Sequence, residues 1–417
     1  MKQLILILLG VLTVQAFGQD VAIIKVSASE TGYKDCPVGV SLDGLDYNED
    51  AGTLVLAERT ARGEVPVPVQ MEPGHAAWLW FILSGETPAG TVREFILRKQ
   101  SARNDPPKIR VVKSDGKLKL SLGEKQILAY QYRMVYPPEG VNPLFKRSGF
   151  IHPLWSPGGQ VLTRIQAPDH YHHYGLWGPW TKTHIEGREV DFWNLMKGQG
   201  TVKFSGFLSE NEGPVFSGFR ALQEHIDFGA RGEDRVAMSE VLDVRVWNAG
   251  NGDFWLIDYT TTLNTPLDTG IMLDAYRYGG GIGYRATEVW NRDNSSVLTS
   301  GGLDRLEADG TKARWCLVEG ESDTEKGRSG IVFMGHPSNR EFPEPMRVWP
   351  VNQNGRGDLY FEFCPIRHHD WKLDRGRDYT LKYRLLVFDG TISVEDAEMY
   401  WRAFADPPRV EVIAAHQ

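Results

Sequence analysis

Three histidines fall within four positions of the chain, at His170, His172 and His173. Imidazole is the side chain best suited to move protons or to hold a metal near neutral pH. On a strand, His170 and His172 point to one side and His173 to the other, unless a turn at Gly175 brings the third ring round. We therefore predict a catalytic site here, with His172 or His173 as general acid or base and His170 as its orienting partner or a metal ligand. A divalent metal ion held by His170 and His172 is one alternative, and structural histidines under an aromatic lid are another.

Tryptophans follow the histidines closely, at Trp177, Trp180 and Trp193. Their broad apolar faces are of the kind that stack on sugar rings. We expect Trp177 and Trp193 to form stacking walls of a binding site.

A second group of candidate residues surrounds three consecutive glycines, Gly279 to Gly281. Glycines allow a backbone to approach a ligand closely, and arginines on either side could hold a carboxylate or sugar hydroxyls. We predict that Tyr276, Arg277 and Arg285 bind substrate. The alternative is a β-bulge or a sharp strand bend with arginines at the surface.

A third group follows the apolar run over residues 331–334. His336 stands at the end of this expected strand, where site residues often gather, and Asn339 and Arg347 come shortly after it. We expect His336 to be catalytic and Asn339 and Arg347 to bind substrate. A histidine in an ordinary turn is the alternative.

The elements that must position these residues are almost all strands. Apolar and polar residues alternate at residues 118–122, and further strand patterns cover residues 21–26, 241–247, 254–263 and 379–388. One helix is expected after Ser393, a helix-capping residue, and before Pro407. The sequence therefore predicts an all-β protein. A small β-sandwich over residues 19–105 and a linker over residues 101–107 precede a large double-sheet sandwich over residues 107–410, which carries the site.

The bulk properties bound the class of protein. Residues 1–18 read as a signal peptide with a short apolar core, cleaved near Gly18, which predicts a periplasmic or secreted protein with no membrane span. The formal net charge is -8, and no basic patch of the nucleic-acid-binding kind is present. The cysteines are Cys36, Cys316 and Cys364, which are too few for a disulfide framework. A single Cys316–Cys364 disulfide is an alternative that the sequence leaves open.

The histidine motif, Asp169-His-Tyr-His-His-Tyr-Gly-Leu-Trp177, resembles a bacterial family long labelled "methane oxygenase PmoA" and now treated as a domain of unknown function. The strings at residues 276–280 and 381–390 are similar to that family too. The family's pattern has Pro and Arg where this chain has Tyr171 and Tyr174. The resemblance, over about residues 107–410, implies a sandwich similar to the galactose-mutarotase supersandwich. It also implies an exported protein associated with glycan breakdown.

Together these observations predict an exported carbohydrate-active enzyme that acts on an oligosaccharide or modified glycoside by hydrolysis or β-elimination. The carbohydrate part of this hypothesis comes from the family resemblance. Two alternatives stay open: a glycan-binding protein without activity, and a metal-dependent oxidoreductase that uses His170 and His172.

Overall fold

The computed structural model describes residues 19–45, 53–72, 77–100, 107–229 and 233–415. The expected signal peptide lies outside these residues, as does nearly all of the expected linker. The strand pairings within these residues are all antiparallel, and the same residues contain one α-helix, α1 (Val394–Ala405). The predicted all-β sandwich class with a short C-terminal helix is confirmed. Within the described ranges, no helix has the length and apolar character needed to cross a membrane.

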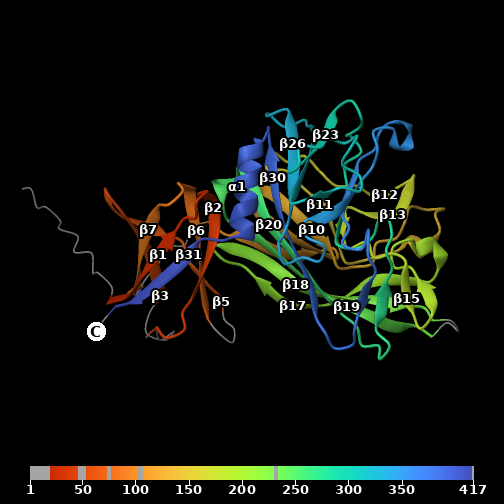
Figure 1. Ribbon diagram of the computed structural model, residues 1–417, viewed down its shortest axis with the longest axis horizontal. Helices are drawn as coiled ribbons and strands as arrows, with labels where there is room; N and C mark the ends of the chain where they lie inside the picture. The colour runs from red at the N-terminus through yellow and green to blue at the C-terminus, as the bar shows by residue number, and fades with distance from the viewer. Residues whose placement is uncertain (1–18, 46–52, 73–76, 101–106, 230–232, 416–417) are drawn as a thin grey trace, which may run out of the picture.

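The N-terminal strands form a five-stranded sheet, ordered β31-β1-β7-β3-β4, and a three-stranded sheet, ordered β2-β6-β5. Ala22, Ile24 and Val26 alternate with more exposed residues on β1 and face an apolar core between these sheets. β31 comes from the other end of the chain and pairs with β1 (Figure 1). The range predicted for the small domain omits β31, and the division into two domains stays a prediction. The strands are β1 (Gln19–Ser27), β2 (Tyr33–Ser41), β3 (Thr53–Thr60), β4 (Gly63–Val67), β5 (Gln70–Glu72), β6 (Trp78–Thr87), β7 (Val92–Gln100) and β31 (Arg409–Ala414).

The large sandwich has an eight-stranded sheet, ordered β17-β18-β19-β20-β30-β26-β25-β23. Its inward side chains alternate along the strands and pack against the nine-stranded sheet, as Phe333 does on Tyr284 with ring centroids 5.1 Å apart. The strands of the first sheet are β17 (Gly200–Asn211), β18 (Phe216–Asp227), β19 (Arg235–Trp247), β20 (Phe254–Asn264), β23 (Ser295–Thr299), β25 (Trp315–Glu321), β26 (Arg328–Gly335) and β30 (Tyr379–Asp389).

The nine-stranded sheet is ordered β24-β27-β28-β22-β14-β11-β10-β9-β8. Several of its strands are short, because the chain leaves the sheet repeatedly to form the loops around the candidate site. Its strands are β8 (Ile109–Ser114), β9 (Lys117–Leu122), β10 (Lys125–Gln131), β11 (Phe150–Leu154), β14 (Leu176–Trp177), β22 (Ile282–Arg285), β24 (Lys312–Ala313), β27 (Glu344–Val348) and β28 (Tyr360–Phe363).

Helix α1 lies between the two sandwiches (Figure 1). The Ser393 side chain accepts a hydrogen bond from the backbone N–H of Asp396 at 3.0 Å, which caps the helix as the sequence predicts. Ala397 and Tyr400 pack into an apolar cluster with Ile82 of the small sandwich and Trp247 of the large one. The helix is therefore a packing element between the sandwiches.

Two small sheets complete the large sandwich. One is ordered β16-β15-β21-β29, and the other is the hairpin of β12 and β13. Figure 1 shows this hairpin at the end of the large sandwich that lies away from the small one. The strands are β12 (Ile165–Ala167), β13 (His170–Tyr174), β15 (Thr183–Ile185), β16 (Arg188–Val190), β21 (Ile271–Leu273) and β29 (Trp371–Leu373).

The three cysteines are buried and free, so no Cys316–Cys364 bridge forms.

Candidate functional site

The three histidines of β13 converge. One ring nitrogen from each of His170, His172 and His173 lies within 4.8 Å of the other two, and we call this group the histidine triad. The ring centroids are 4.8 to 5.3 Å apart. A zinc ion with tetrahedral geometry holds its nitrogen ligands about 3.4 Å from one another. The triad is therefore close to the size of a metal site and needs only small side-chain shifts to close on an ion.

Of the two arrangements that the sequence left open, the structure has the one in which the His173 ring turns toward the other two histidines. The register between β12 and β13 is irregular between its two paired positions, so β13 does not follow a regular alternation. Gly175 then adopts φ +72°, and a β-carbon there would lie 2.6 Å from the Ile151 carbonyl oxygen. A backbone conformation that requires glycine thus occurs two residues after His173 and accompanies the convergence of all three rings.

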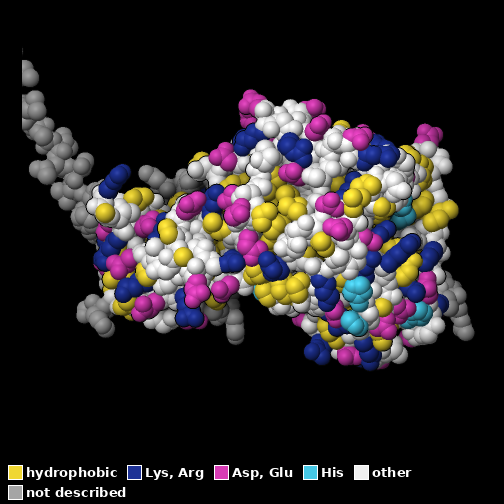
Figure 2. Space-filling model, turned by 45° about the horizontal axis from the view of Figure 1, so that its top comes forward, with side chains coloured by type: hydrophobic (Ala, Val, Ile, Leu, Met, Phe, Trp, Pro, Cys, Tyr) yellow, Lys and Arg dark blue, Asp and Glu magenta, His cyan; other side chains and the backbone are white. Residues whose placement is uncertain are grey.

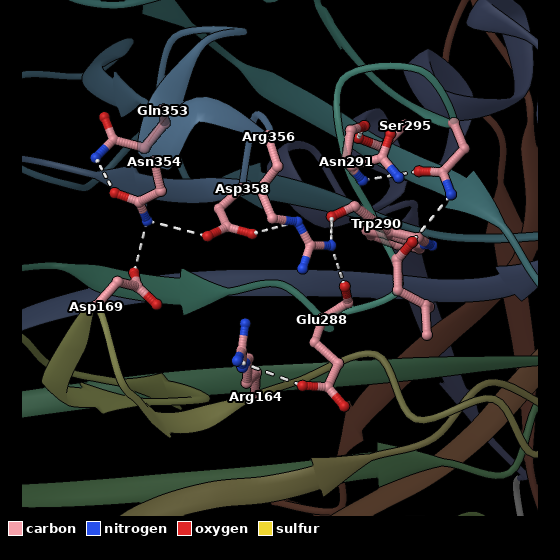
Figure 3. Close-up of polar contacts among 12 residues, drawn as sticks. Arg164, Asp169, Glu288, Trp290, Asn291, Ser295, Gln353, Asn354, Arg356 and Asp358 are labelled. Atoms are coloured by element: carbon pink, nitrogen blue, oxygen red, sulfur yellow. Dashed lines mark hydrogen bonds and ion pairs between the residues drawn. The ribbon is translucent and has the colours of Figure 1, made fainter.

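A carboxylate orients the first histidine. His170 Nδ1 lies 2.8 Å from Asp169 Oδ2, which leaves Nε2 of that ring free to bind a ligand. The Arg285 guanidinium in turn donates to both Asp169 oxygens, at 3.1 and 2.9 Å. The Asn354 amide donates to Asp169 at 2.7 Å and to Asp358 at 3.0 Å (Figure 3). Asp169 is therefore fixed from several directions, and it fixes His170.

The electrostatics of the triad favour neutral imidazoles at His172 and His173. Burial lowers the pKa of His172 to about 4, and the neighbouring His170 acts in the same direction. Burial also lowers the pKa of His173 well below 6.5, and His173 Nδ1 is buried without a hydrogen-bond partner among the described residues. Burial alone would raise the pKa of Asp169, but the hydrogen bond with His170 and the charge of Arg285 outweigh it and hold the pKa below its usual range. Neutral rings beside an ionised carboxylate are ready to bind a metal.

Aromatic rings surround the triad. Measured between ring centroids, Trp349 lies 4.7 Å from His170 and 5.3 Å from His173, and Tyr360 lies 5.0 Å from His173. Trp193 packs against His172 and His173 and donates its indole N–H to the His172 carbonyl at 3.0 Å. Trp193 therefore lies beside the triad, but it is only 3% exposed and does not form the expected open stacking wall.

Trp177 does not form an exposed wall. Its side chain is fully buried behind His173, with ring centroids 5.4 Å apart, because β14 is a central strand of the nine-stranded sheet. As described, Trp177 supports the triad and is not available for stacking on a ligand.

The glycine-rich segment reaches the site in part. Arg285 reaches the site through its ion pair with Asp169, and its side chain is buried. It also pairs with Asp358 and lies over the face of Trp349, 4.6 Å from the ring centroid. It positions the site and does not project toward a substrate. Tyr278 packs on Trp193 at 4.7 Å, and Tyr276 and Arg277 lie against Tyr278.

The third predicted group lies elsewhere. The His336 ring packs on Phe404 of α1, at 5.1 Å, and its Nδ1 bonds the Ser338 hydroxyl. The buried Asn339 amide donates to Glu344 and to a backbone carbonyl. Arg347 pairs with Asp309 at 2.8 Å. These contacts account for the three side chains without any link to the triad, so we no longer place His336, Asn339 and Arg347 in the site.

Two buried carboxyl groups stand on adjacent strands behind the aromatic layer, Glu362 on β28 and Glu344 on β27. Glu362 accepts hydrogen bonds from the Tyr360 hydroxyl at 2.8 Å and the Gly279 N–H at 2.6 Å. Glu344 contacts the Tyr383 hydroxyl at 2.8 Å. Burial raises the pKa of each to about 8, although these hydrogen bonds act against the rise.

This arrangement predicts that stability falls with rising pH. An unfolded Glu loses its proton near pH 4.5, whereas the folded chain keeps both protons up to about pH 8. Between these values the folded state binds more protons, so the free energy of unfolding decreases as pH rises and levels off above about 8. Glu344→Gln should remove the part of this pH dependence that Glu344 contributes. That part is on the order of a few kcal/mol in the free energy of unfolding between pH 4.5 and about pH 8. Denaturant unfolding from pH 5 to pH 9 measures this, and a variant slope equal to that of the wild type contradicts it.

A polar cleft adjoins the hairpin that carries the triad. It has a volume of about 490 Å³ and is lined by residues of β12 and by Gln160, Thr163, Arg164 and Thr287, among others. A second cleft, of about 420 Å³, shares Gln160 and Val289 with the first. Arg164 is paired with Glu288 at 3.3 Å, so the first cleft carries a balanced ion pair and many neutral hydrogen-bonding groups (Figure 3).

Sequence reasoning missed several residues of the site. Trp349, Asn354, Asp358 and Tyr360 come from segments that pair or pack with the triad only in the folded chain. Asp169 directly precedes His170, and this adjacency was the one local signal of its role.

The comparisons with known proteins place the chain in a family. The family model described as "Family of unknown function (DUF6807)" matches residues 117–402, which is more than half of the chain. The chain belongs to this family. The part matched by DUF6807 contains the triad, Asp169, Arg285 and the surrounding aromatic residues. The predicted resemblances to the methane oxygenase label and to the mutarotase supersandwich stay predictions.

Two solved structures from Enterococcus faecalis are similar to this DUF6807 chain. One is an alpha-mannosidase from strain V583, with 9% identity, a TM-score of 0.46, and coverage of 95% of this chain and 46% of that chain. The other is a protein in the glycosyl hydrolase family 38, with 9% identity, a TM-score of 0.47, and coverage of 95% and 47%. The chain thus spans less than half the length of either. A search among curated proteins gives no match.

Proposed function

We propose that this protein is an exported carbohydrate-active enzyme that works with a divalent metal ion bound by His170, His172 and His173. The observation that carries the proposal is the convergence of three imidazole nitrogens within 4.8 Å. The bond between His170 and Asp169 supports it, because metal-bound histidines commonly donate their second ring N–H to a carboxylate. The low pKa of His172 favours a ligand over a proton donor at neutral pH.

A metal ion in this site would act as a Lewis acid that polarises a substrate oxygen or acidifies bound water. Three protein ligands leave a further position open for such an oxygen, as in catalytic zinc sites. Hydrolysis or β-elimination of a glycoside uses this chemistry. The three histidines would hold the ion, and Asp169, itself held by Arg285, keeps His170 in place.

The carbohydrate part of the proposal is supported by the surroundings of the triad. The first cleft, which is lined by β12 of the hairpin, offers amide and hydroxyl groups, such as those of Gln160 and Thr287, which suit sugar hydroxyls. Figure 2 shows Lys, Arg, Asp and Glu side chains mixed over one face of the molecule, without a single-sign patch that would point to a polyanion. A neutral, hydroxyl-rich substrate fits the polar lining of the first cleft.

The test is elemental analysis of the purified protein, followed by turnover assays on a panel of glycosides and oligosaccharides with and without a chelator. We expect about one equivalent of zinc or a similar divalent ion and activity that the chelator removes. Binding without turnover would favour a glycan-binding protein, and bound copper or iron with redox turnover would favour an oxidoreductase. Absence of any bound metal after loading would overturn the proposal.

Asp169→Asn should weaken metal binding. Because it also leaves the buried Arg285 with Asp358 as its one charged partner among the described residues, the affinity is compared at a temperature where both proteins are folded. The substitution removes the carboxylate that orients His170, and loss of such a partner typically costs about 10- to 100-fold in metal affinity. Competition with a chromophoric chelator measures the affinity. Glu186→Gln is the matched control, because Glu186 is an exposed carboxylate paired with Arg235 outside the site. Equal affinities in the wild type and Asp169→Asn would contradict the role of Asp169.

A further inference from the structure

Apolar side chains crowd one border of the triad at the surface. They stand on or beside two short 3-10 turns, η2 (Pro143–Phe145) and η3 (Leu195–Lys197), which contact each other. Tyr136 is 61% exposed, Met196 is 56% exposed and Leu144 is 36% exposed. Together with the partly buried Phe145 and Tyr171 we call these residues the apolar rim.

The apolar rim is continuous with the triad. The Phe145 ring stacks on His172, with centroids 6.4 Å apart and an interplanar angle of 24°, and lies 5.5 Å from Tyr171. Trp193, which bonds the His172 carbonyl, stands two residues before η3. A molecule bound at the triad would therefore meet the rim on this side.

The backbone that presents the rim is firmly held. The Tyr174 hydroxyl and the Gln166 amide both donate to the Phe145 carbonyl, the latter at 3.3 Å. Asp191 accepts from the backbone N–H groups of Trp193 and Asn194, at 2.9 and 2.8 Å, just before η3. Apolar side chains that are exposed on a firmly held backbone, next to the histidines of the triad, are typical of a binding surface.

We propose that the apolar rim binds the apolar aglycone of a glycoside whose sugar lies at the triad. This inference rests on the proposed function and names its substrate class as glycosides with an aryl or alkyl aglycone. Phe145 and Tyr171 offer ring faces and Leu144 and Met196 offer flexible aliphatic surface, which together suit an aromatic or alkyl group. A stable protein partner needs some 20 to 30 residues a side, so five rim side chains suit a small molecule better.

The experiment compares pairs of ligands that differ only in the aglycone. Methyl and 4-nitrophenyl glycosides of each sugar in a panel are titrated into the zinc-loaded protein, and their Kd values are measured by calorimetry. We expect the 4-nitrophenyl glycoside to bind about tenfold more tightly than its methyl partner, which is the gain from burying an aromatic ring partly. The double variant Leu144→Ser and Met196→Ser should bring this ratio near one while the methyl glycoside keeps its Kd.

Leu208→Ser is the matched control, because Leu208 is similarly exposed, at 52%, but lies outside the apolar rim. It stands on β17, eight residues after Gly200, and it is the Gly200 end of that strand that lies next to η3. This variant should keep the tenfold ratio. A ratio near one in the wild type, or a ratio unchanged in the double variant, overturns the aglycone subsite even if zinc binds and glycosides turn over. A wild type that is dimeric in light scattering and a monomeric double variant would also overturn it, because the rim would then be a self-association surface. Metal content, measured separately, reports on the proposed function alone.

Discussion

His172→Ala is expected to empty the metal site and to abolish measurable turnover. Two of the three ligand nitrogens remain, and the ring that stacks on Phe145 is lost. A catalytic metal ion supplies several kcal/mol of transition-state stabilisation, so turnover should fall about a thousandfold or more. The melting temperature should change little once both proteins are compared without metal, because His172 is only partly buried.

The measurements are metal content, turnover and melting temperature on the same preparations. His184→Ala is the matched control: His184 is a partly exposed histidine whose Nδ1 lies 2.6 Å from Asp274, outside the triad. It should retain metal and activity. Activity that falls only in step with melting temperature would assign His172 a structural role, and full metal content with full turnover would sink the catalytic assignment.

Arg285→Met is expected to cost on the order of 3–5 kcal/mol in the free energy of unfolding. The side chain is buried between Asp169 and Asp358, and removing one partner of a buried charge group leaves the others uncompensated. Asp169 has its pKa lowered in the fold, so its stabilising contribution is present above its unfolded-state value of 3.8 and disappears as pH falls below it. The difference in the free energy of unfolding between the wild type and Arg285→Met should therefore become smaller below about pH 4.

Denaturant unfolding at pH 7 and at acid pH measures this effect. Arg285→Lys keeps the charge but not the planar guanidinium that reaches both carboxylates and covers Trp349. Its loss should be smaller than that of Arg285→Met. Equal midpoints for Arg285→Met and the wild type at pH 7 would show that this network does not stabilise the fold.

Local patterns were sufficient to predict the secondary structure class. Alternation of apolar residues predicted strands such as β9 and β19, and Ser393 predicted the start of α1, because these features depend on neighbours in sequence. The pairing of β31 with β1 has no local signal. It joins two strands that are separated by almost the whole sequence, and the periodicity of neither strand indicates its partner.

The candidate site was predictable only in its centre. The three histidines stand together in the sequence, so their grouping was visible, but the irregular pairing of β12 and β13 that accompanies the convergence of His173 was not. His336 and Arg347 have suitable side chains in suggestive places, yet α1 and Asp309 contact them in the fold. Arg285 was predicted to hold substrate, and its two carboxylate partners instead make it part of the framework.

The position of β31 has a consequence for how the protein matures. β31 is an edge strand whose removal would leave the backbone of β1 unpaired along residues 22–27, and an open edge of this kind is a template for pairing with other chains. The N-terminal sheet is therefore complete only after residues 409–414 have been synthesised. Chains that end before residue 409 should therefore aggregate, whereas chains that include β31 complete the sheet and bury this edge.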